Sequence, residues 1–166
     1  MSLHPPLRRC WMRRGQRKRI AAPGSPRYHH VFGALNWRTQ QVDWITAYRK
    51  NTDSFIAFVE HLLTVCYPTQ RLVLVLDNAS YHKSYAALAA LSLFQDRLQV
   101  IWLPKYSPYL NPIERFWLQL KNHASANQLH LNPDRLEAAI RRAVTNQNTP
   151  GHPDRLELTD HFQLVA

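Results

Sequence analysis

Glycine and cysteine are scarce in this sequence, and each scarcity argues against a class of site. Only 4 of the 166 residues are glycine. The chain therefore has little capacity for a glycine-rich loop that cradles phosphate, and it carries no Gly-x-Ser-x-Gly element of the kind found in serine hydrolases. Its 2 cysteines, Cys10 and Cys66, form no Cys-x-x-Cys pair, and no paired histidine spacing indicates a zinc site. A reducing compartment is the simpler expectation.

Long hydrophobic runs are also absent. The longest uncharged apolar stretch, Ala86 to Phe94, is about half of the roughly 20 residues that a membrane span needs. The N-terminus is too rich in arginine and too interrupted by proline to be a signal peptide. We therefore expect a soluble protein in the cytoplasm, with no membrane partner.

Acidic residues are few, and the positive charge is concentrated at one end. The sequence has 21 Lys and Arg against 11 Asp and Glu, for a net charge of +10. Nine of these cations precede the first acid, Asp43, and residues 1–27 show four prolines and no helical or strand period. We predict an irregular basic arm over residues 1–27, whose charge favours a polyanionic partner such as nucleic acid, a solvated tail being the alternative. The expected contacts are Arg8, Arg9, Arg13, Arg14, Arg17, Lys18 and Arg19, with Lys105 in a later loop.

The rest of the chain has the length and the 45% hydrophobic content of one domain with one core. Hydrophobic periodicity and capping residues predict the order strand, strand, helix, strand, helix, strand, helix, helix, which is an α/β fold. The expected strands are 30–37, 41–49, 72–76 and 98–103. The expected helices start at Asn51 or Thr52, run over 84–95, and begin again at Asn111 and Asn132, each of the last two followed by proline at the first helical position.

The run Leu72 to Leu76 is apolar at every position. Such a run is typical of a strand with both faces buried in a parallel or mixed sheet, with helices above and below it. Asp77 follows at its carboxyl end, where open α/β sheets bind ligands. An acid at that place is a candidate site residue, although an aspartate there also commonly starts a turn or caps a helix.

Glu114 is a second candidate acid. It lies in the first turn of a predicted helix, beside the apolar stripe Ile113, Trp117 and Leu120, so it can face a sheet edge without being buried; stabilisation of the helix start is the alternative role. If Asp77 and Glu114 converge, their joint use is to bind Mg²⁺ or Mn²⁺, which prefer carboxylate oxygens. No rival catalytic set is convincing, and the pair His29–His30 is more simply incidental than metal-binding.

Two blocks carry a resemblance to a known family. Residues 74–82 (LVLDNASYH) and residues 102–117 (WLPKYSPYLNPIERFW) strongly resemble the DDE endonuclease domain of mariner-related bacterial insertion-sequence transposases. The 36 residues between Asp77 and Glu114 fit the spacing of the second and third acids in such enzymes. The resemblance covers residues 3–125. It implies a ribonuclease-H-like mixed sheet flanked by helices, with Asp77 and Glu114 as catalytic metal ligands and with Asn78, His82 and Asn111 near them.

The first acid of the family has no counterpart in this sequence. It should fall directly before the segment where the chain begins, and Asp43 and Asp53 are poor substitutes because they lie on a predicted hairpin and at a helix start. We therefore expect a transposase fragment that lacks its first central strand, has a partial catalytic core over residues 28–125, and ends in a helix and tail over 126–166. Without a third acid, metal binding and strand cleavage should be weak.

Two functions remain open from the sequence. In the first, the chain is a DDE transposase domain that cleaves and transfers DNA strands with Mg²⁺ or Mn²⁺ during transposition of an insertion sequence. In the second, it is a catalytically inactive remnant that binds only DNA or a partner chain, because an open sheet edge invites pairing with another chain, a second copy included. An unrelated α/β metal phosphoesterase would leave residues 102–117 unexplained.

Overall fold

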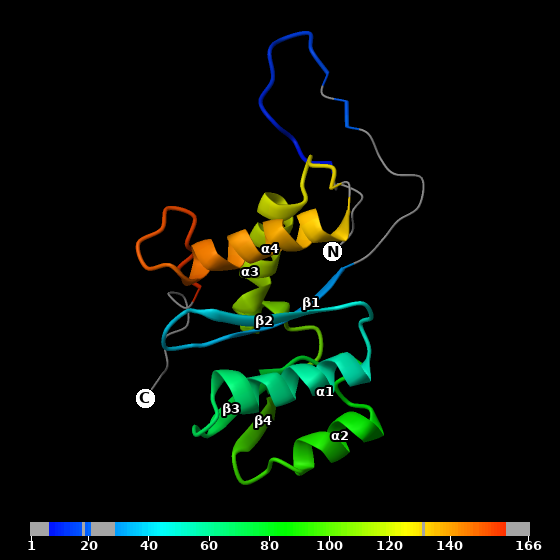
Figure 1. The fold of residues 1–166 in the computed structure, drawn as a ribbon, viewed down its shortest axis with the longest axis vertical. Coiled ribbons are helices and arrows are strands. Elements are labelled where there is room, and N and C mark those ends of the chain that lie inside the picture. The colour runs from blue at the N-terminus through cyan, green and yellow to red at the C-terminus, as the bar shows by residue number, and fades with distance from the viewer. Residues whose placement is uncertain (1–6, 18, 21–28, 131, 159–166) are drawn as a thin grey trace.

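The computed structural model describes residues 7–17, 19–20, 29–130 and 132–158, and residue 18 of the basic arm lies outside them. Figure 1 shows the elements in space. In chain order they are β1 (His30–Leu35), β2 (Val42–Ala47), α1 (Thr52–His61), the π-helical turn η1 (Leu62–Cys66), β3 (Leu72–Leu76), α2 (Tyr85–Ser92), β4 (Leu98–Trp102), the 3₁₀ turn η2 (Pro108–Leu110), α3 (Ile113–Ala124) and α4 (Pro133–Asn148). The predicted order of strands and helices is confirmed.

The four strands of the described residues form two separate sheets. β1 and β2 pair as an antiparallel hairpin, with Phe32 opposite Ile45 and Gly33 opposite Trp44. β3 and β4 pair in parallel through the crossover helix α2. The hairpin turns at residues 37–39, close to the predicted place.

Side-chain caps set where α1, α2 and α4 start. Oγ of Ser84, before α2, accepts a hydrogen bond from the Ala87 amide at 3.2 Å. The Asn51 side chain accepts a hydrogen bond from the Ser54 amide at 3.1 Å, and Asn132 accepts one from Arg135 at 3.0 Å, as predicted. The predicted cap at Asn111 is wrong. α3 begins at Ile113 with Pro112 at its N-cap and no side-chain capping bond, and Asn111 supplies only its backbone carbonyl, which accepts from Glu114 at 3.1 Å.

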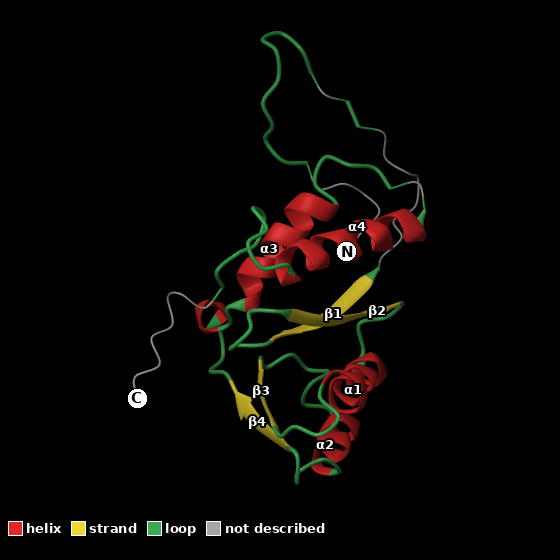
Figure 2. Ribbon diagram, turned by 60° about the vertical axis from the view of Figure 1, so that its left-hand side comes forward, coloured by secondary structure: helices red, strands yellow, loops and turns green. Residues whose placement is uncertain are grey.

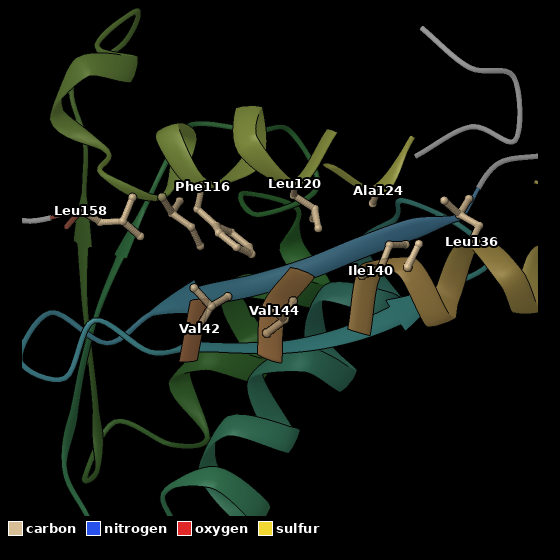
Figure 3. Close-up of a cluster of buried hydrophobic side chains, with 10 residues drawn as sticks. Val42, Phe116, Leu120, Ala124, Leu136, Ile140, Val144 and Leu158 are labelled. Atoms are coloured by element: carbon tan, nitrogen blue, oxygen red, sulfur yellow. The ribbon is translucent and has the colours of Figure 1, made fainter. Parts of the chain in front are cut away.

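Two hydrophobic clusters lie on opposite faces of the β1–β2 hairpin, because residues along a strand alternate between faces. Figure 3 shows the first, in which α3 and α4 pack over Val42. α3 belongs to the predicted catalytic core, residues 28–125, and α4 belongs to the predicted C-terminal segment. The two helices share this cluster, so these two predicted parts pack against each other. The second cluster joins Phe32 to α1, α2 and the β3–β4 pair, and Figure 2 shows α1 and these strands on the far side of the hairpin from α3 and α4.

The prediction that β3 is buried on both faces is wrong. Leu72, Leu74 and Leu76 face the second cluster, whereas Val73 and Val75 are 59% and 48% exposed. α3 and α4 cover β1 and β2 but leave this face of β3 and β4 open within the described residues. Burial here depends on which sheet the last helices cover, and an apolar run does not encode that choice.

The described part of the arm, residues 7–17 and 19–20, contains no helix or strand. Its start is fixed to the loop between α3 and α4. The Arg8 amide donates to Oδ1 of Asn127 at 2.9 Å, and Nδ2 of Asn127 donates to the Arg8 carbonyl at 3.0 Å. Among the helices of the described residues, none is long and apolar enough to cross a membrane.

Candidate metal and nucleic-acid site

A groove of about 930 Å³ lies between β1 and β3 and contains the candidate acids at one end. All residues of both strands line it, together with apolar side chains of α1 on one side and of α3 on the other. Asp77 and Glu114 are both part of this lining, so two acids that are far apart in the sequence reach the same groove.

Asp77 directly follows β3 and is held by one of its two carboxylate oxygens. Its Oδ1 atom lies 2.9 Å from Nδ1 of His82 and accepts a hydrogen bond from the Ala79 amide at 3.0 Å. The side chain is 52% exposed, and within the described residues no hydrogen bond engages Oδ2. This oxygen is therefore available to a ligand from solvent.

His82 is buried beneath Asp77, and its ring lies 4.3 Å from the ring of Phe55 between centroids. Burial lowers its pKa below 6.5, although the neighbouring Asp77 carboxylate opposes this shift. The imidazole is therefore neutral at neutral pH. Because a carboxylate can only accept, Nδ1 must carry the proton that His82 donates to Asp77.

The charges of both candidate acids influence the side chain of Tyr81. Desolvation by burial raises its pKa to about 12, and the charges of Asp77 and Glu114 both add to the increase. Its ring also packs edge-on against Phe55 and lies 5.2 Å from Nζ of Lys50. The phenol of Tyr81 thus lies within electrostatic reach of both candidate ligands.

Two other residues predicted to lie near the acids, Asn78 and Asn111, have different surroundings. Asn78 donates to the Leu103 carbonyl at 2.5 Å and accepts from Nζ of Lys83, so it ties the end of β3 to the end of β4. Lys83 also lies 4.7 Å from the ring centre of Trp102. Asn111 lines the groove beside Glu114. Asn78 thus joins the ends of two strands, whereas Asn111 is part of the groove lining.

Two residues of the site were not identified from the sequence, namely Tyr81 and Lys50. Tyr81 lies inside the block 74–82, directly before His82, so its position in that motif could have indicated it. Lys50 lies in the loop after β2 and lines the same end of the groove, and no sequence signal marked it.

The other acids and histidines considered from the sequence lie elsewhere. Asp43 is on β2 and accepts a hydrogen bond from the Tyr67 hydroxyl at 2.6 Å, and Asp53 is in the first turn of α1, as expected. His29 is buried with Nε2 at 3.4 Å from the Glu137 carboxylate of α4. In the residues described here, no group of three or more His, Cys, Asp or Glu is arranged to hold a metal ion.

The predicted DNA contacts that the structure describes are all exposed. They comprise Arg8, Arg9, Arg13, Arg14, Arg17 and Arg19 of the arm and Lys105 of the loop after β4. Lys18 lies outside the described residues. Cys10 and Cys66 are both free thiols.

Comparisons with known proteins identify the family. The family model described as DDE superfamily endonuclease matches residues 1–137. A curated relative, the insertion element IS630 uncharacterized 39 kDa protein of Shigella sonnei, is 30% identical over 125 residues, which are 75% of this chain and 36% of the relative. The chain therefore spans about a third of the length of that relative.

Solved structures agree on the fold. The Mos1 transposase in its paired-end complex with the left transposon end is 17% identical, with a TM-score of 0.56 over 87% of this chain and 48% of that chain. The Mos1 strand transfer complex gives 16% and 0.55 over 87% and 47%. These likenesses confirm the predicted ribonuclease-H-like α/β fold, and with the match over residues 1–137 they lead to one conclusion: the chain belongs to the DDE superfamily endonucleases.

Proposed function

We propose that this chain is the DDE domain of an insertion-element transposase, in which Asp77 and Glu114 bind Mg²⁺ or Mn²⁺ for DNA strand cleavage and strand transfer. One observation carries the proposal: both acids line the same groove, and both raise the pKa of Tyr81. The family and the insertion-element relative support the reaction class. One of the Mos1 structures is described as a complex with Mn, which supports the metal class.

The chemistry of the two side chains fits this ion. Both are exposed carboxylates, whose hard oxygens are the ligands that Mg²⁺ and Mn²⁺ prefer, and the open groove leaves room for water and phosphate oxygens. When bound, such ions activate an attacking hydroxyl and stabilise the leaving oxygen of a phosphodiester. In this chain His82 orients Asp77 by holding Oδ1, and within the described residues Oδ2 makes no hydrogen bond.

A catalytically inactive protein that binds DNA is the second candidate function. It is favoured by the absence of any group of three ligating side chains in the part of the chain that the structure describes. Two carboxylates alone hold a pair of metal ions poorly, so activity depends on a third ligand. That the chain lacks its first strand and first acid remains a prediction, as do homo-oligomer formation and location at the nucleoid.

A nicking assay distinguishes the two functions. Supercoiled DNA is incubated with the protein and Mn²⁺, and the variants Asp77→Asn and Glu114→Gln are compared with Asp96→Asn. Asp96 is an exposed acid between α2 and β4 that does not line the groove. The transposase proposal predicts nicking that both site variants abolish and Asp96→Asn retains. Nicking that all three variants retain, or none by the unmodified chain, would leave DNA binding as the supported function.

DNA binding by the arm is tested separately from cleavage. If the exposed arginines neutralise phosphates, the affinity for any DNA duplex falls steeply with salt, with a slope on logarithmic axes of about −0.9 for each phosphate contacted. Replacing Arg13 and Arg14 with glutamine should make the slope shallower by about 2. A salt dependence that these replacements leave unchanged would remove the arm from the interface.

A further inference from the structure

Lys50 is an exposed cation that lines the same groove as Asp77 and Glu114. The ion pairs within the described residues join their cations to Asp77, Glu137 and Asp154, and none of them involves Lys50. No acid of the described residues therefore neutralises its ammonium group at close range. The group is available to an anion that enters the groove from solvent.

The segment that carries Lys50 is attached to the segment that follows Asp77. Oγ1 of Thr52 donates a hydrogen bond to the Tyr81 carbonyl at 3.4 Å and lies 3.0 Å from Oγ of Ser84. Nζ of Lys50 itself lies 5.2 Å from the centroid of the Tyr81 ring, which is within the range of a cation–π contact. These contacts hold the cation beside the loop that begins at the end of β3.

The side chain of Tyr81 relates Lys50 to the two acids. Its ring packs edge-on against Phe32 of the second cluster, with 6.1 Å between the ring centroids, so the core fixes its position. Burial first, and then the charges of Asp77 and Glu114, raise the pKa of its phenol. One anchored side chain thus lies under the cation and within electrostatic reach of both carboxylates.

The charges at this end of the groove would repel DNA without a cation. Asp77 and Glu114 are negative, and so is every phosphodiester of a DNA backbone. His82 offers little compensation, because burial lowers its pKa and the charge of Lys50 adds to that decrease. Lys50 is therefore the group at this end that can offset the repulsion between the acids and a phosphate.

We propose that Lys50 binds a phosphodiester of the DNA strand that enters the groove, and that this contact places the backbone in front of Asp77 and Glu114. This role rests on the proposed function, since it takes the groove as the site of DNA. A lysine ammonium suits it, because its three N–H donors bind phosphate oxygens as a point charge. Lys50 also differs from the described arginines of the arm, none of which lines the groove.

The salt dependence of DNA binding without metal tests the contact. A fluorescent DNA duplex is titrated with the full chain in EDTA at several salt concentrations. Lys50→Gln and Lys50→Arg are compared with Arg49→Gln, a change at the adjacent exposed cation, which does not line the groove. We expect Lys50→Gln to make the slope on logarithmic axes shallower by about 0.9, and Lys50→Arg to keep it. Arg49→Gln should change it by less than about 0.3.

Either of two results would overturn the proposal. One is a slope that Lys50→Gln leaves unchanged, which would mean that its ammonium contacts no phosphate. The other is an equal change in Lys50→Gln and Arg49→Gln, which would mean that both residues contribute only to the general positive charge of the surface.

Neutralising an acid shows whether the bound phosphate lies at the acids. In EDTA, Glu114→Gln removes a charge that faces the phosphate, so DNA should bind about two- to threefold more tightly. Asp96→Asn, which removes the same charge outside the groove, should change the affinity less. In a Lys50→Gln background the gain from Glu114→Gln should shrink, because the phosphate is no longer held there. Equal gains from the two acids, or a gain that Lys50→Gln leaves unchanged, would also overturn the proposal.

These measurements contain no metal, so their outcome is separate from that of the nicking assay. DNA binding in which Lys50 has no part, together with nicking that the site variants abolish, would remove the role of Lys50 and keep the proposed function. The expected slope change in a chain that does not nick DNA would keep the role of Lys50 and remove strand cleavage.

Discussion

Nδ1 of His82 lies 2.9 Å from Oδ1 of Asp77, which joins a buried imidazole to an exposed acid at the end of β3. The contact has two consequences. It fixes the orientation of the carboxylate that we propose as a metal ligand, and it places a titrating group beneath the site. Because burial outweighs the attraction of Asp77, the pKa of His82 is lowered, and the folded protein favours the neutral ring.

This lowered pKa predicts that acid destabilises the protein through His82. As the pH falls below about 6.5, the unfolded chain takes up a proton at this histidine before the folded chain does, so the free energy of unfolding decreases until the pH reaches the folded pKa. Urea unfolding at about pH 7.5 and pH 5.5 measures the effect. In His82→Gln the decrease between these two pH values should be smaller than in the unmodified chain. If the two decreases are equal, burial of His82 does not govern this pH dependence.

Tyr81 reports on the convergence of the two acids without any assay of activity. Its pKa is raised to about 12 by burial first and then by the charges of Asp77 and Glu114. Asp77→Asn and Glu114→Gln should each lower this pKa, so that more of Tyr81 is ionised at about pH 11. NMR titration of labelled tyrosine measures it, with Glu60→Gln on the exposed side of α1 as the control. A tyrosine that responds to one acid only would mean that the two carboxylates do not share a site.

The sequence predicted the elements well where the signal is local. Asn51 and Asn132 cap their helices because a side-chain oxygen reaches an amide three residues on, which requires no other part of the fold. The predictions failed where the outcome depends on packing between distant segments. Val73 and Val75 are exposed because α3 and α4 cover the other sheet, and Asn111 does not cap because the helix begins two residues later, after Pro112.

The candidate site likewise combines features that local sequence signals predict with features that depend on packing between distant segments. The positions of Asp77 and Glu114 follow from a strand end and a helix start, which the hydrophobic pattern indicates. Their meeting in one groove depends on the tertiary fold, and the sequence suggested it only through the family resemblance. Lys50 could not be identified in advance, since it comes from a loop of the neighbouring hairpin and reaches the site across the ring of Tyr81.

Gly33 provides a test of how tightly α3 packs on β1. A Cβ added at this residue would lie 2.7 Å from Cη2 of Trp117 and 3.2 Å from the Asp43 carbonyl oxygen. Gly33→Ala should therefore lower the free energy of unfolding by about 1–3 kcal/mol, as overpacking does. In a Trp117→Leu background the same change should cost less, because the ring is gone. Urea denaturation of the four proteins measures the difference, and an equal cost in both backgrounds would mean that Trp117 is not the obstacle.

The anchor of the basic arm gives the last prediction. Asn127 holds Arg8 by two hydrogen bonds and has a positive φ of 54°. Asn127→Gly removes both bonds and keeps a backbone that glycine adopts without strain, so the arm should detach while the core stays folded. Trypsin should then cleave after Arg13 and Arg14 several times faster, with little change in the urea midpoint. Tyr106→Gly, at an exposed residue with a φ of 60°, is the matched control, and equal cleavage rates in the two variants would show that Asn127 does not anchor the arm.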